Sequence, residues 1–154
     1  MMNNIYNSYA EIKPRVLMIL SLCEDIWIDA DKIVALDFIT TYSKEFGFFD
    51  KNLHGDSFYK YSELANRKES IYNAVRNLVL ERMIDYNLSS GFKYKINVQG
   101  LDFIKMINCE YSINYRCIAT VIVNQFGDKP SSVLIKKIQE KSFENSKEVN
   151  NANN

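Results

Sequence analysis

The stretch from Tyr61 to Val98 constrains the fold most, because its hydrophobic period changes partway along. Its first part carries apolar residues at three- and four-residue steps, the spacing of one helical face, at Leu64, Ile71, Val75, Leu78 and Val79. After Arg82 the period becomes two, which is typical of strands, and Ser89-Ser90-Gly91 offers a corner where glycine supplies a positive φ. The stretch therefore predicts a helix followed directly by a two-stranded hairpin. We expect Phe92, Tyr94, Ile96 and Val98 on one face of the hairpin, and Lys93, Lys95 and Asn97 on the other.

Two further helices are predicted before this stretch. Pro14 suits the first turn of a helix that ends near Glu24, because its missing N–H costs nothing there. Asp29 is suited to cap a second helix that runs to about Lys44. Helix, helix, helix and hairpin is the order of a winged helix-turn-helix.

A long insert, residues 46–61, separates the second and third helices, where a compact helix-turn-helix has a turn of three or four residues. The insert includes Phe46, Phe48, Phe49, Leu53, Phe58 and Tyr59. Because it is too apolar for a free loop, we expect it to fold back on the domain; the alternative is that it lies open for a partner.

Helices are also predicted after the hairpin, from Leu101 to Ile107 and from Ser112 to Phe126. The second is apolar nearly all round, which is typical of a helix buried on several sides. It could be buried in a dimer or against another subunit, or it could cross the back of the first helix and the insert. A short amphipathic helix begins at Pro130, and the Asn-rich end is predicted to be disordered.

The predicted fold is therefore mainly α with a small β hairpin, a winged helix-turn-helix core with extra C-terminal helices. A chain of 154 residues suits one domain. Its parts are an N-terminal arm (1–12), a winged-helix domain (13–98) with the insert 46–61, a C-terminal helical extension (99–141) and a disordered tail (142–154).

The amino-acid composition limits which partners and which cellular compartment are expected for the chain. Lys plus Arg and Asp plus Glu both total 19, so no net charge draws the chain to a polyanion. Three cysteines are an odd number and lie in predominantly apolar sequence, so we expect no disulfide framework and a reducing compartment. The start lacks the pattern of a signal peptide, and no apolar run is long enough for a membrane span. We expect a cytoplasmic protein without a membrane partner.

Sequence patterns of catalytic or metal sites are not found. The five glycines lack the spacing of a dinucleotide fingerprint or P-loop, and His54 is the only histidine. Cys23, Cys109 and Cys117 lack the close spacing of zinc ligands. We therefore expect no enzyme, no catalytic residue, no metal, no cofactor and no small-molecule substrate.

One carboxylate is expected to be structural. Asp37 lies in the middle of the second predicted helix, beside Leu36 and Phe38. A buried carboxylate without a partner would be costly, so we expect a cationic or backbone N–H partner, with Arg67 as the candidate.

Two kinds of binding surface are considered. Protein-partner contacts are expected at Phe48, Phe49 and His54 of the insert, and at Ile118, Val121, Ile122 and Phe126 of the apolar helix. DNA contacts are the alternative, through Arg67, Lys68 and Arg76 of the third helix and Lys93 and Lys95 of the hairpin. Glu69 and Glu81 on the same helix weigh against DNA, and a solvated polar face would explain the same residues.

The chain resembles the middle components of bacterial ABC-type three-component systems, of which the Lamassu anti-phage systems are examples. The resemblance covers roughly Arg15 to Gln125. Its motifs are, in order, Leu36-Asp37-Phe38, Tyr42-Ser43, Leu53-His54, Glu63-Leu64 and Arg67-Lys68, followed by the hairpin segment Gly91–Tyr94. The chain departs from the family at Tyr42, where histidine is frequent, and near the Leu-His pair, where Gly55 and Phe58 replace prolines.

This resemblance implies a non-enzymatic adaptor subunit, with two partners encoded in the same operon. One is an SMC-like ATPase that senses foreign DNA, and the other is an effector, expected to be a nuclease. The adaptor would hold both in an inactive anti-phage complex that reaches DNA through the assembly. The alternative function is a winged-helix transcriptional regulator that binds DNA itself.

Overall fold

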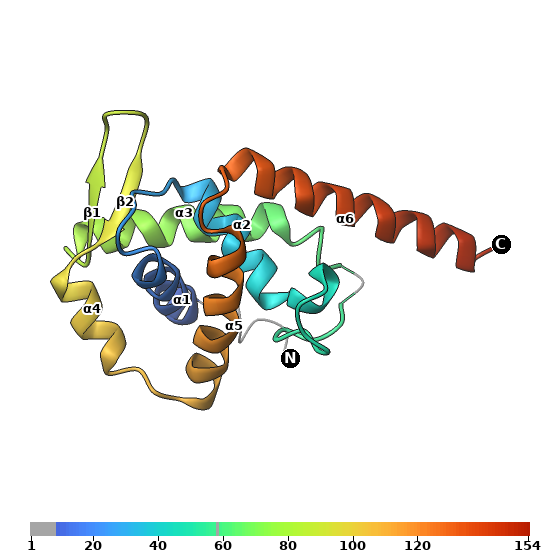
Figure 1. Cartoon of the computed structure of the whole chain (residues 1–154), viewed down its shortest axis with the longest axis horizontal. Helices are drawn as coiled ribbons and strands as arrows, with labels where there is room; N and C mark the ends of the chain where they lie inside the picture. Colours follow the sequence, from blue (N-terminus) through green and yellow to red (C-terminus); the bar gives the residue numbers. More distant parts are fainter. Residues whose placement is uncertain (1–8, 58) are drawn as a thin grey trace.

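The computed structural model describes residues 9–57 and 59–154 of the chain. The described part is mainly helical, with a small antiparallel hairpin (Figure 1), as the sequence predicted. The elements are, in chain order, α1 (Tyr9–Leu22), α2 (Ala30–Thr41), the 3-10 helix η2 (Ser43–Phe46), α3 (Leu64–Leu80), β1 (Ile84–Asn87), β2 (Lys93–Ile96), α4 (Val98–Lys105), α5 (Glu110–Phe126) and α6 (Ser131–Ala152).

The first helix begins earlier than the sequence predicted. Most of the predicted arm, residues 1–8, lies outside the described residues, and α1 already includes Tyr9. Pro14 therefore lies inside α1 and not in its first turn. Proline is unfavourable there, but the residues after it, Val16 to Leu20, are fully buried, and this packing outweighs the local preference.

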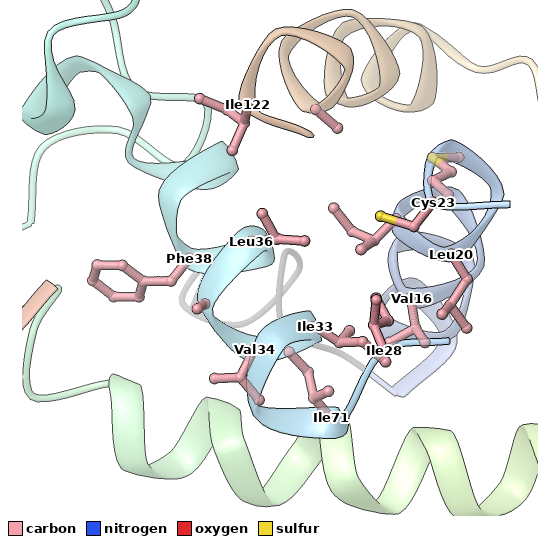
Figure 2. Packing of buried hydrophobic residues seen from close by; sticks show 14 of the residues in the cluster. Val16, Leu20, Cys23, Ile28, Ile33, Val34, Leu36, Phe38, Ile71 and Ile122 are labelled. Carbon is pink, nitrogen blue, oxygen red and sulfur yellow. The ribbon is translucent and has the colours of Figure 1, made fainter. Parts of the chain in front are cut away.

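Helix α2 is the centre of the core. The Asp29 side chain caps it as predicted, accepting a hydrogen bond from the Lys32 amide at 2.7 Å. Figure 2 shows α2 between α1, α3 and α5, with Ile33 and Leu36 facing α1. The helix ends at Thr41, short of the predicted Lys44, because η2 follows, and Asn52 of the insert accepts a hydrogen bond from the Lys44 amide at 3.0 Å.

The insert folds back on the domain, as expected. The Phe48 ring meets the Phe126 ring edge-on, with 5.6 Å between centroids, and Leu53 packs against the core. The His54 amide donates to the Thr41 carbonyl at 3.2 Å, which ties the insert to the end of α2. Phe58 lies outside the described residues.

The hairpin turns where the sequence predicted, and Gly91 has a φ of +81°. Ile84 pairs with Ile96 at its buried base, and Tyr86 pairs with Tyr94. The prediction for Val98 was wrong, because this residue begins α4. The reason is the side chain of Asn97, which caps α4 by accepting a hydrogen bond from the Gly100 amide at 3.1 Å.

Helix α5 packs against α1 and α2, so the second of the two predicted arrangements is the one observed. It is not buried on several sides, however. Its inner side includes Tyr115, Ala119 and Ile122, whereas Ile113 and Val121 are exposed.

Helix α6 packs on α2 through Leu134 and Ile138 and then continues to Ala152, so the predicted disordered tail is helical. Its C-terminal end projects from the body of the molecule (Figure 1). Asn-rich composition indicated disorder, but successive turns are linked by the Lys141–Glu144 ion pair and by Lys147 over the Phe143 ring. Such pairs favour a helix even where little apolar surface is buried.

Replacing Gly100 by alanine should destabilise the protein by about 1–3 kcal/mol through overpacking. A Cβ atom there would clash with the Met83 carbonyl oxygen and lie 2.7 Å from Ile96 Cγ1 at the base of the hairpin. Urea unfolding of the two proteins measures the difference. The matched control is Gln99→Ala on the exposed side of α4, and equal stability of both variants would contradict the close packing.

Candidate functional site

A buried ionic cluster joins the helices around Asp37, which is 1% exposed. Arg15 of α1 donates to both carboxylate oxygens, from Nε to Oδ1 at 2.9 Å and from Nη2 to Oδ2 at 2.6 Å. The Tyr115 hydroxyl of α5 donates to Oδ1 at 2.6 Å. Bidentate charge-assisted bonds of this kind fix both distance and orientation, so the cluster holds α1, α2 and α5 in register.

Arg67 of α3 is the second cation of the cluster. Its Nη1 lies 3.5 Å from Asp37 Oδ2 and donates to the Thr41 hydroxyl at 2.6 Å. Its guanidinium carbon lies 5.2 Å from the centroid of Phe38 and 5.3 Å from that of Tyr42. The predicted pairing with Asp37 is confirmed, and the predicted DNA contact at Arg67 is wrong, because a side chain at 3% exposure cannot contact DNA in this fold.

The cluster keeps Asp37 ionised. Burial alone would raise the pKa of Asp37, but the charges of Arg15 and Arg67, with the hydrogen bonds from Arg15 and Tyr115, lower the pKa to about 2. Burial and the neighbouring carboxylate raise the pKa of Tyr115 well above its ordinary value. The chemistry suits a fixed internal ion pair that ties four helices together.

His54 lies at the edge of this cluster. Its Nε2 is 2.6 Å from the Tyr111 hydroxyl, and its ring stacks on Tyr111 with 5.9 Å between centroids. Burial first, and then the positive charges of Arg15 and Arg67, lower the pKa of His54 to about 3. His54 is therefore neutral at pH 7. It was predicted to contact a partner, whereas the structure shows it half-buried against α5 of its own chain.

The other predicted partner-contact residues differ in exposure. Ile122 and Phe126 are buried, so their side chains pack in the chain's own interior and are not available to a partner in this fold. Phe48, Phe49 and Ile118 are half-buried, and Val121 is exposed.

A groove of about 690 Å³ lies between the start of α2, the second half of α3 and the hairpin. It is lined by Asp29, Ala30, Asp31, Tyr72, Val75, Arg76, Val79, Leu80, Tyr86, Leu88, Phe92 and Tyr94. Four of these apolar or aromatic side chains are between 54% and 73% exposed, namely Leu80, Tyr86, Leu88 and Phe92. An apolar surface gathered in a concave site is characteristic of a binding surface.

The charges around the groove do not make a basic surface. Lys68 pairs with Asp31 at 3.4 Å. Lys93 and Lys95 alternate with Tyr94 along β2, so they lie on the opposite face of the hairpin, where Lys95 Nζ is 5.9 Å from the Trp27 ring. Of the residues predicted to contact DNA, only Arg76 lines the groove.

Sequence reasoning missed two parts of these sites. Arg15 was not assigned, although it lies three residues after Ile12 and four before Ile19, on an apolar helical stripe. The groove was also not predicted. Its signal was a pair of apolar residues outside both predicted stripes, namely Leu80 beside the helical face and Leu88 before the hairpin corner.

No group of three or more His, Cys, Asp or Glu side chains in the described part of the chain could hold a metal ion. None of the helices among residues 9–57 and 59–154 combines the length and apolar character needed to cross a bilayer.

The fold and the groove define a small, mainly helical chain with an apolar surface suited to binding another macromolecule. The chain matches the family described as the ABC-three component (ABC-3C) system Middle Component 2 over residues 5–148, and it belongs to this family. The resemblance to middle components is thereby confirmed. No curated protein and no solved structure is similar enough to the chain to count as a match. The family implies that the chain works with partner components of a multi-component system.

Proposed function

We propose that this chain is a non-catalytic adaptor that joins an SMC-like ATPase to an effector, a nuclease, in a Lamassu-like anti-phage defence system of the bacterial cytoplasm. The observation that carries the proposal is the exposed aromatic groove between α3 and the hairpin, in a chain of the Middle Component 2 family. Apolar side chains that stay exposed in the isolated chain are explained if another component covers them.

We further propose that the scaffold is a winged helix-turn-helix with the insert 46–61 between its second and third helices. The supporting observation is a backbone bridge between Ile28, which precedes α2, and Tyr94 of β2, with N–O distances of 3.1 and 2.8 Å. This bridge puts the Ile28 segment, β2 and β1 side by side in that order. A winged helix presents α3 and the hairpin together, which is where the groove lies.

The alternative, a DNA-binding regulator, has less support. Arg67, one of its predicted DNA contacts, is buried in the ionic cluster, and Lys68 forms an ion pair with Asp31. Its remaining cations, Arg76, Lys93 and Lys95, are divided between two faces of the hairpin region. DNA binding requires a basic surface that neutralises several phosphates, and the division of these predicted contacts between two faces does not favour one.

Co-expression with the two other components of the system tests the adaptor proposal. We expect affinity purification through a tag on this chain to recover a stable complex that contains both components, and the mass of the complex gives its stoichiometry. An unrelated ATPase with the same tag arrangement is the control. A chain that elutes alone, and that binds DNA with a steep dependence on salt concentration, would contradict the adaptor and favour the regulator.

A further inference from the structure

The outer edge of β1 has backbone groups that are free to pair with another strand. Tyr94 of β2 exchanges both of its backbone hydrogen bonds with Ile28, so its N–H and C=O point away from β1. Residues opposite each other in an antiparallel pair alternate between hydrogen-bonded and non-hydrogen-bonded. The Tyr86–Tyr94 pair is therefore non-hydrogen-bonded, and the N–H and C=O of Tyr86 point away from β2. No described residue bonds to them.

This free edge borders the groove. The side chains of Tyr86 and Tyr94 line the groove, so they define the face of the hairpin that looks toward α3. Figure 1 shows β1 on the outer side of the hairpin. A strand added beside β1 would direct every second side chain to the face that Tyr86 shares with the groove, whose lining from α3 includes Val79 and Leu80. Strand and helix together thus form the arrangement that peptide-binding domains use when they bind an extended segment.

The charge of the groove indicates the chemistry of that segment. Asp29 accepts hydrogen bonds from the Lys32 amide and from the Ser131 hydroxyl, and Asp31 pairs with Lys68 and Tyr72. Arg76, by contrast, has no ion-pair partner among the described residues. The acids of the groove are already paired, whereas Arg76 is exposed and open to a ligand, so a ligand of complementary charge would bring a carboxylate to Arg76.

We propose that an extended, apolar segment of a partner component, with one Asp or Glu among its apolar residues, adds as a third hydrogen-bonded strand to the free edge of β1. Its alternate side chains occupy the groove, and its carboxylate pairs with Arg76. This inference rests on the proposed function, because the segment belongs to another component of the same system. The same groove could be covered by DNA or by a second copy of this chain, and the experiments below separate these occupants.

A photo-crosslinking analogue of phenylalanine in place of Phe92 identifies the occupant in the co-expressed complex. Phe92 is exposed at the hairpin tip, so the replacement does not disturb the core. We expect a crosslink to a single segment of a partner component, identified by mass spectrometry after digestion. The same analogue in place of Phe143, which is equally exposed on α6, is the control and should not give that crosslink. Crosslinks only to DNA or to a second copy of the chain would overturn the proposal.

Two further measurements test strand addition and the charge. In hydrogen exchange, the Tyr86 amide should exchange slowly in the complex and fast in the isolated chain. The reason is that its outward N–H is hydrogen-bonded only when another strand pairs with β1. Arg76→Glu should weaken binding of the partner component by about tenfold or more, since it places like charges together. Lys136→Glu, an exposed charge reversal on α6, is the matched control, and circular dichroism confirms that both variants fold.

The outcomes distinguish this inference from the proposed function. A wild-type chain that forms no complex overturns both proposals. A normal complex whose Tyr86 amide stays unprotected, and which tolerates Arg76→Glu as well as Lys136→Glu, overturns the strand-addition proposal alone and leaves the adaptor in place.

Discussion

Asp37→Asn should destabilise the protein by about 3–5 kcal/mol, the cost of removing one partner from a buried ion pair. Asparagine has nearly the same shape as aspartate, so the variant removes the charge and leaves the packing of α2 intact. Arg15 and Arg67, both 3% exposed or less, would then lose the one carboxylate with which both form ion pairs. Urea or thermal unfolding, followed by far-ultraviolet circular dichroism, measures the loss.

The matched control is Asp31→Asn in the first turn of the same helix. Asp31 pairs with Lys68 at the surface, where such pairs contribute about 0–1 kcal/mol. A double-mutant cycle adds a second test, because Arg15→Met should cost less in the Asp37→Asn background than in the wild-type chain. Equal losses for Asp37→Asn and Asp31→Asn would show that the buried cluster does not stabilise the fold.

Much of the fold could be predicted from the sequence because its signals are local. The step of three and four residues from Leu64 to Val79 and the glycine at 91 specify a helix and a turn through backbone geometry alone. Where the prediction was wrong, interactions distant in sequence override the local preference. Pro14 lies inside α1 because the residues after it are buried, and α2 ends early because Asn52 of the insert binds the chain at Lys44.

The binding surface was harder to predict for the same physical reason. A groove is made by side chains from α2, α3 and the hairpin that come together only in the folded chain, and each contributes one or two residues that have no pattern of their own. Ile122 and Phe126 illustrate the opposite error. Their apolar character was assigned to a partner, but the core of the chain itself buries them. The number of apolar residues can be counted in a sequence, but whether their side chains face the core or the solvent is known only from the fold.

Acid should destabilise the protein through His54 well before Asp37 titrates. The folded-state pKa of His54 is about 3, below the ordinary value of 6.5, so the unfolded chain binds this proton first as the pH falls. The contribution of neutral His54 to stability is complete above pH 6.5 and is lost as the pH falls towards 3. The expected slope is about 1.4 kcal/mol per pH unit between these values for one proton. The stability that ionised Asp37 contributes is lost only as the pH falls below the ordinary pKa of aspartate, 3.8.

The variant His54→Gln separates the contribution of His54 to the pH dependence of stability from that of Asp37, because glutamine can still bond to the Tyr111 hydroxyl but does not titrate. Its free energy of unfolding should be nearly constant from pH 6.5 to 4.5, whereas that of the wild-type chain should fall by about 2–3 kcal/mol. Below pH 4 both proteins should lose stability as Asp37 and other carboxylates protonate. Parallel curves for the two proteins from pH 6.5 to 4.5 would mean that water reaches His54 and that the insert opens from α5. The curves therefore report how firmly residues 46–61 are held to the domain, since the low pKa of His54 depends on its burial there.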